Sequence, residues 1–156
     1  MHACRQLVCL AIAAIAAPTA AQAPAAAPAP APLAAQETNL PGVSAEVTEF
    51  KRRGNTLTVK VRMSNTGSED VTVDLEYDKT YVLDAAGGRK YEVLRDDAKN
   101  YIAAIGPSYS NRYWNTLKPG QPLLVWMKFP APPPEVKTAT FQLDDTPPFD
   151  DLASQD

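Results

Sequence analysis

The feature that most constrains this fold is a strict two-residue alternation of apolar and polar side chains. Between Asn55 and Asn65, Leu, Val, Val and Met alternate with Thr, Lys, Arg and Ser. Successive side chains of a β-strand point to opposite faces of a sheet, so this pattern predicts a strand with one buried face. The chain beyond its N-terminus shows no long segment with the 3.6-residue period of an amphipathic helix. The sequence therefore predicts an all-β domain.

Six further segments have strand-like composition: 43–51, 71–76, 80–83, 89–94, 123–129 and 136–143. Turn sequences such as Asn65-Thr66-Gly67-Ser68 and Lys118-Pro119-Gly120 separate them. In 43–51 the alternation predicts that Phe50 faces away from Ala45 and Val47. About seven short antiparallel strands with regularly spaced turns are typical of an immunoglobulin-like β-sandwich, and a small β-barrel is the alternative.

Residues 1–23 have the order of a secretory signal peptide. A short basic start precedes the apolar run Leu7–Ala17, and small residues follow it. This run is shorter than the roughly 20 apolar residues that span a bilayer. We expect cleavage near residues 21–23, export to the periplasm or the extracellular space, and no transmembrane segment after removal of the signal. The alternative is an Ala-rich tail without a targeting role.

Ala and Pro dominate residues 24–38, with Pro24, Pro28, Pro30 and Pro32 spaced through the first part. Such a segment buries no apolar core and favours extended conformations, so it predicts a semi-rigid linker. The remaining residues, 39–152, have the length of a single domain.

The predicted signal peptide contains His2, Cys4 and Cys9, which are the only His and Cys residues of the chain. Its removal would leave no imidazole or thiolate for a Ser-His-Asp triad, a cysteine nucleophile or a zinc site. We therefore expect a non-enzymatic protein without a cofactor. The net charge of −3 disfavours nucleic acid as a partner, because phosphate binding needs a basic surface.

Aromatic residues form the first candidate site. Tyr109, Tyr113 and Trp114 fall in the least regular segment of the domain, which we interpret as an exposed loop. Such rings can hold a protein partner or stack on a glycan. The alternative is that they close the end of a small core.

Carboxylates form a second candidate site, and a basic cluster forms a third feature. Calcium takes oxygen ligands, and the candidates for it are Asp144, Asp145, Asp150 and Asp151. The alternative for these residues is solvated loop charge.

Lys51-Arg52-Arg53 is a basic cluster in a predicted turn, either an anionic-polymer contact or a solvated turn.

Four stretches give the chain a resemblance to a known group of domains. They are LDAAGGRKYEVLRD at 83–96, LKPGQ at 117–121, VWMKFPAPP at 125–133 and TPPFDD at 146–151. Together they resemble exported bacterial immunoglobulin-like domains of uncharacterised function, over about Val43–Leu152. The resemblance implies a β-sandwich and a place in the cell envelope, and it implies no catalytic residues. We expect a binding module whose partner is an envelope protein, with a glycan as the alternative.

Overall fold

The computed structural model describes residues 31–104 and 111–155, so the predicted signal peptide lies outside the described residues. The described part contains ten strands and a single 3-10 turn, η1 (Tyr77–Lys79). The strands are β1 (Ala34–Glu37), β2 (Val43–Arg53), β3 (Thr56–Asn65), β4 (Val71–Glu76), β5 (Tyr81–Asp84), β6 (Arg89–Glu92), β7 (Arg112–Leu117), β8 (Leu123–Pro130), β9 (Thr138–Gln142) and β10 (Phe149–Ala153). Every pairing between these strands is antiparallel, which confirms the predicted all-β class.

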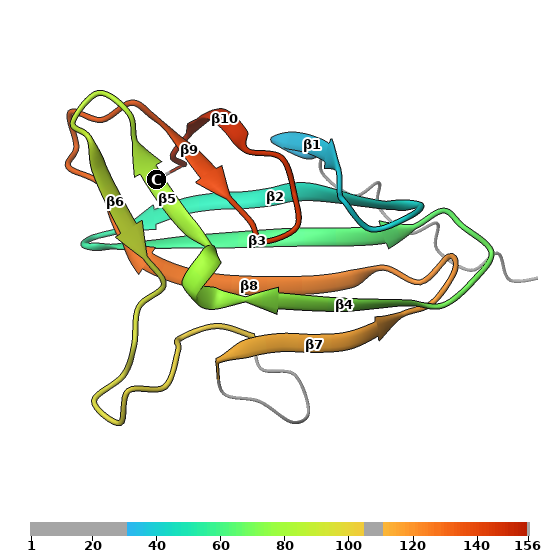
Figure 1. Ribbon diagram of the computed structural model, residues 1–156. Helices are drawn as coiled ribbons and strands as arrows, with labels where there is room; N and C mark the ends of the chain where they lie inside the picture. The colour runs from blue at the N-terminus through green and yellow to red at the C-terminus, as the bar shows by residue number, and fades with distance from the viewer. Residues whose placement is uncertain (1–30, 105–110, 156) are drawn as a thin grey trace, which may run out of the picture.

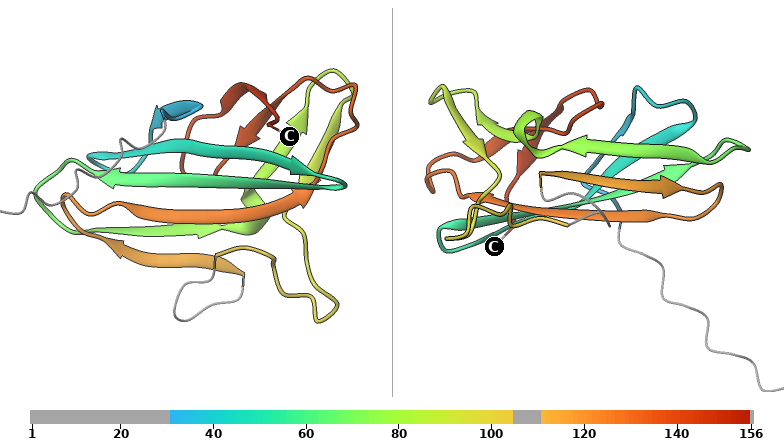
Figure 2. Two further views of the ribbon diagram at one scale, coloured as in Figure 1. Left: turned by 180° about the vertical axis from the view of Figure 1, so that it is seen from behind. Right: turned by 60° about the horizontal axis from the view of Figure 1, so that its bottom comes forward.

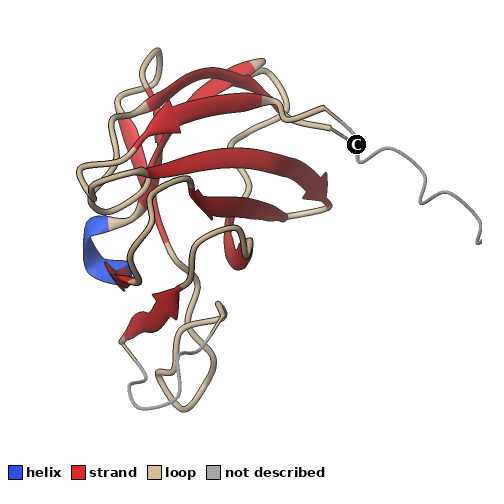
Figure 3. Cartoon of the chain, turned by 90° about the vertical axis from the view of Figure 1, so that its right-hand side faces the viewer, coloured by secondary structure: helices blue, strands red, loops and turns tan. Residues whose placement is uncertain are grey.

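The strands form three sheets that pack around one core. Their orders are β1-β2-β3-β8, β10-β9-β5-β6 and β4-β7. Strands β5 and β9 cross over β2 and β3, while β4 and β7 run along β8 (Figures 1 and 2). Figure 3 shows the strands wrapping the interior, with η1 as a short helical turn at one side. Phe141 lies in the core, with its ring centroid 6.0 Å from that of Phe129 and 5.9 Å from that of Phe149.

A β-bulge in β2 overturns the predicted orientation of Phe50. The register between β2 and β3 shifts between Val47 and Glu49, so one extra residue enters β2. The extra residue reverses the alternation, and both Val47 and Phe50 are buried. The uniform two-residue period predicted for 43–51 was wrong beyond Val47.

Three strands were not predicted, so the count of about seven is corrected to ten in the described part. β1 lies within the predicted linker 24–38, which therefore ends before Ala34. β7 lies in the segment predicted as a loop, and β10 lies among the acidic residues near the C-terminus. The seven predicted strands are all present, within a few residues of their expected bounds.

Both ends of the described chain cover the outer edge of β2. β1 pairs with Ser44–Val47. Beyond the bulge, Gln155 donates its N–H to the carbonyl of Phe50 at 2.9 Å and accepts the N–H of Arg52 at 2.7 Å. An exposed strand edge invites pairing with other chains, and these two segments remove most of that edge.

Asn65, at the end of β3, connects two sheets through its side chain and is 3% exposed. Its Nδ2 donates to the carbonyls of Glu69 at 2.7 Å and Leu117 at 3.1 Å, and its Oδ1 accepts the N–H of Gly67 at 2.9 Å. The side chain therefore holds the turn after β3 and the end of β7 together.

We predict that Asn65→Ala lowers the free energy of unfolding by roughly 2–3 kcal/mol, because it leaves buried backbone groups without partners. Urea unfolding followed by tryptophan fluorescence measures the change. Ser68→Ala, in the same turn but exposed, is the control and should change stability by less than about 0.5 kcal/mol. Equal effects of the two substitutions would contradict the role of Asn65.

Candidate functional site

Strand β7 contains the described members of the predicted aromatic site. Tyr113 and Leu117 are buried, whereas Trp114 is 36% exposed. The predicted exposed loop is thus a strand, and the ring of Tyr113 faces the core; its hydroxyl accepts a hydrogen bond from Asn115 at 3.1 Å. Tyr109 lies outside the described residues. Trp114 is the described aromatic residue of this group that faces solvent.

The backbone pattern shows which edge of β7 is open. The register pairs Glu76 with Arg112. The N–H of Glu76 donates to Oδ2 of Asp144 at 2.9 Å, so this pair is a non-hydrogen-bonded pair of the ladder. Because the pattern repeats every two residues, the N–H and C=O groups of Trp114 and Thr116 also point away from β4.

A side-chain contact agrees with this assignment. The N–H of Thr116 donates to Oδ1 of the neighbouring Asn115 at 2.8 Å, and not to the backbone of a partner strand. Among the described strands, β7 pairs with β4 alone. Within the described residues, no strand pairs with the outward main-chain groups of Trp114 and Thr116, which lie beside the exposed indole.

Other strand edges of the described domain are less suited to pairing. β6 has four residues, of which Arg89, Lys90 and Glu92 are charged. β10 contains two aspartates and a register shift, and one edge of β8 is partly covered by a bridge from Ala103 to Met127. β7 has six residues without proline, lysine or a register shift. Charge, bulges and short length are the usual protections of an edge, and the charge in β7 is limited to Arg112 at its start.

The surface around Trp114 is polar without a large net charge. Asp74 is its cross-strand partner, and Oδ2 of Asp74 lies 2.8 Å from Nη1 of Arg112. The guanidinium and the carboxylate neutralise each other next to the indole. A second apolar spot lies on the outer face of the first sheet, where Leu124 and Trp126 are 56% and 36% exposed.

Tyr101 has a structural role at η1. Its ring centroid lies 5.2 Å from that of Tyr77, and the guanidinium of Arg95 lies 4.1 Å from the centre of its ring. Its hydroxyl donates to Asp78. Burial and the carboxylate of Asp78 raise the pKa of Tyr101 to about 12. The phenol thus remains a neutral donor that holds the segment before β7 against η1.

The carboxylates predicted as calcium ligands form hydrogen bonds within the domain. Asp144 is buried and accepts the N–H groups of Glu76 and Asp145. Asp150 accepts the hydroxyl of Thr140 at 2.8 Å. Over residues 31–104 and 111–155, no three His, Cys, Asp or Glu side chains are grouped as metal ligands. The acidic residues here shape the loop between β9 and β10.

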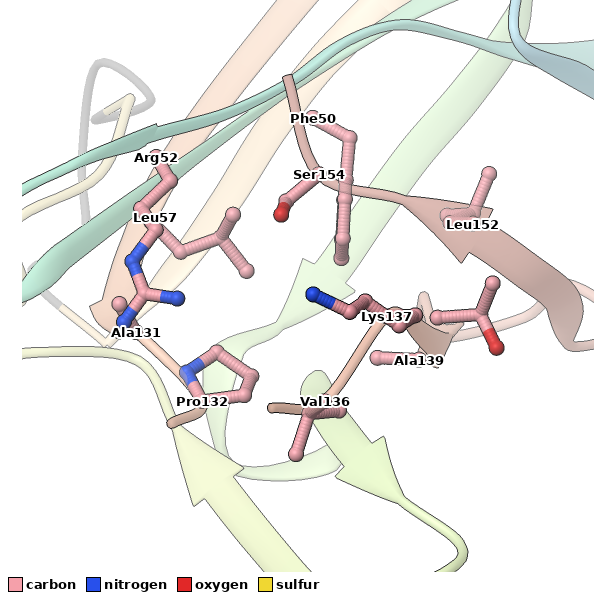
Figure 4. A pocket seen from close by; sticks show the side chains of 11 residues that line it. Phe50, Arg52, Leu57, Ala131, Pro132, Val136, Lys137, Ala139, Leu152 and Ser154 are labelled. Atoms are coloured by element: carbon pink, nitrogen blue, oxygen red, sulfur yellow. The ribbon is translucent and has the colours of Figure 1, made fainter. Parts of the chain in front are cut away.

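A small cavity lies at the end of the domain where the β2–β3 turn meets the loop between β8 and β9 (Figure 4). Phe50, Leu57 and Leu152 contribute its apolar wall. Its free space of about 10 Å³ is close to that of one water molecule. This cavity therefore has no room for an organic ligand. Arg52 and Lys137 lie at its mouth.

No protein-family model, no curated protein and no solved structure matches this chain. Within the described residues, no helix has the length and apolar character needed to cross a membrane. The candidate sites are therefore interpreted from their own chemistry.

Asp145 provides a test of the acidic loop. Burial and the charge of Asp144 raise the pKa of Asp145 above its ordinary value of 3.8. The folded state thus binds this proton more tightly than the unfolded state, and stability falls as the pH rises through the raised pKa. Asp145 also has a φ of 55°, which Asn adopts readily.

We predict that Asp145→Asn raises the melting temperature at pH 7. The matched control is Asp151→Asn, because Asp151 has the same φ of 55°. The change from Asp to Asn therefore has the same effect on the backbone conformation at both positions. At pH 7, the melting temperature measured by thermal unfolding should rise more in Asp145→Asn than in Asp151→Asn. This difference between the two variants should shrink as the pH is lowered to 3. A difference between the variants that does not depend on pH would refute the electrostatic explanation.

Proposed function

We propose that this chain is an exported, non-enzymatic binding module of the cell envelope, and that it binds a protein partner along β7. The basic, apolar and small-residue order of residues 1–23 supports export, and the Ala/Pro-rich segment after it supports a tethered domain. The resemblance of four sequence stretches supports an immunoglobulin-like sandwich. Packed antiparallel sheets are consistent with that topology.

The open edge of β7 beside Trp114 is the observation that supports this function most directly. An extended segment of a partner can add a strand there and bond to the outward main-chain groups of Trp114 and Thr116. In strand addition, main-chain hydrogen bonds supply affinity and neighbouring side chains supply specificity. Trp114 supplies the large apolar contact that dominates many protein interfaces.

A glycan is the second candidate ligand, and the surroundings of Trp114 favour it specifically. A flat indole next to the Asp74–Arg112 pair offers a stacking surface together with hydrogen-bonding groups. Strand addition depends on the backbone edge, whereas sugar stacking depends on the indole and its side-chain neighbours. A proline substitution on the edge therefore separates the two modes.

We predict that Trp114→Lys and Thr116→Pro each reduce capture of a protein partner at least tenfold. Proline at 116 removes an N–H that points away from β4, so the β4–β7 pairing is retained. The measurement is in-cell cross-linking of the tagged full chain, followed by mass spectrometry. Trp126→Lys is the control. It changes an equally exposed tryptophan on β8, in the sheet β1-β2-β3-β8, and should leave capture unchanged.

The glycan alternative gives a different pattern. Under this alternative, an envelope glycan quenches tryptophan fluorescence in the wild type and in Thr116→Pro but not in Trp114→Lys. That result would show that the ligand of β7 is a glycan and not a protein. Capture of the same partner by wild type and both β7 variants would place the binding surface elsewhere and refute the role of β7. Circular dichroism of each variant confirms that it is folded.

A further inference from the structure

We infer a second binding site, for a phosphate-type oxyanion, between Arg52, Lys137 and Ser154 at the end of the domain. The inference is independent of the β7 surface and uses different residues. It assigns a function to Arg52 of the basic cluster, which lies at the end of β2 and not in the turn predicted for it, and which the proposed protein interaction does not use.

The three polar groups come from three separate parts of the chain. Arg52 belongs to β2, Lys137 to the loop that leads into β9, and Ser154 follows β10. All three line one depression, together with Pro134 and Val136. Figure 4 shows the ammonium of Lys137 and the hydroxyl of Ser154 near each other, with the guanidinium of Arg52 on the other side of Leu57. A ligand in this depression therefore meets donors from three parts of the chain.

The charges of Arg52 and Lys137 are not neutralised by any other described residue. Within residues 31–104 and 111–155, neither Arg52 nor Lys137 takes part in an ion pair with a carboxylate. Among the described residues, no carboxylate lines the depression; Glu135 lines the neighbouring groove, which Lys137 also borders. Although the chain has a net charge of −3, these two cations line the same depression. They favour an anionic ligand by direct charge complementarity.

Backbone contacts hold the donors in place. The two hydrogen bonds between Gln155 and β2 place Ser154 beside Arg52. Nε of Arg52 donates to the carbonyl of Gly54 at 3.3 Å, which leaves its terminal nitrogens available. Nζ of Lys137 lies 3.4 Å from the carbonyl of Pro134, in a loop stiffened by consecutive prolines. Donors held in advance bind with a smaller loss of conformational entropy.

The shape of the site favours a phosphate group over a lipid tail or a carboxylate. The cavity below the cations has room for about one water molecule, so an acyl chain does not enter it. A phosphate has oxygens on several sides and matches donors that come from several directions, and an Arg fork binds it in a bidentate manner. The low-polarity wall of Phe50 and Leu57 strengthens the attraction between the charges.

The test is a titration of the ¹⁵N-labelled full chain with inorganic phosphate, followed by NMR. We expect saturable shifts of the amides of Arg52, Lys137 and Ser154. The double variant Arg52→Gln/Lys137→Gln should weaken phosphate binding at least tenfold. Lys128→Gln, on the outer face of the first sheet, is the matched control and should bind as the wild type does. Sodium chloride at equal ionic strength serves as the blank.

Two arms identify the source of the phosphate group. Sedimentation with phosphatidylglycerol vesicles, but not with phosphatidylcholine vesicles, and its loss in the double variant would assign a lipid headgroup. Saturation by inorganic phosphate without vesicle binding would assign a soluble phosphate or a phosphate-bearing polymer. Non-saturable shifts spread over all exposed cations, or equal binding by a folded double variant, would overturn the site. None of these outcomes depends on β7.

Discussion

Strand β3 is the element on which the other parts of this fold depend. It pairs with β2 along one edge and with β8 along the other. Its inward side chains, Leu57, Val59, Val61 and Met63, are fully buried. At its end, Asn65 holds the turn into β4 and the last residue of β7. Burial of an alternating apolar face sets the register of all these partners, because a slip of one residue would turn the apolar side chains toward water.

Strands with a buried apolar face were predictable, and strands defined by tertiary pairing were not. β3 and β8 follow the two-residue period over their length, so their orientation could be derived from the sequence. β2 departs from it because the bulge after Val47 is a property of its pairing with β3. β1 consists of Ala, Ala, Gln and Glu, and nothing in that composition indicates a strand; it forms because the edge of β2 supplies its partners.

β7 illustrates the same limit at the candidate site. The two-residue alternation of β7 is concealed in the sequence. The apolar Trp114 is on the outer face, and the polar Asn115 is on the inner face between Tyr113 and Leu117, where it bonds to Tyr113. The prediction that Trp114 lies at the surface is confirmed, but an open strand edge is visible only once the neighbours of a strand are known. The basic cluster 51–53 was also visible in the sequence, although it lies at the end of β2 and not in a turn. Lys137 and Ser154, which complete the cationic depression, come from distant parts of the chain, and only the fold brings them together.

The position of β1 has a mechanical consequence. Any load that reaches this domain from its N-terminal side enters through β1, which is joined to the rest by a short ladder with β2 and by a hydrogen bond from the Gln36 side chain to the carbonyl of Pro148. Peeling such a strand breaks its hydrogen bonds one after another, whereas shearing the long β2–β3 ladder would break many at once. Tension would therefore detach β1 first and leave the apolar core closed. The domain would lengthen under pull without unfolding, and the uncovered part of β2 would become a new strand edge that exists only while the tension lasts.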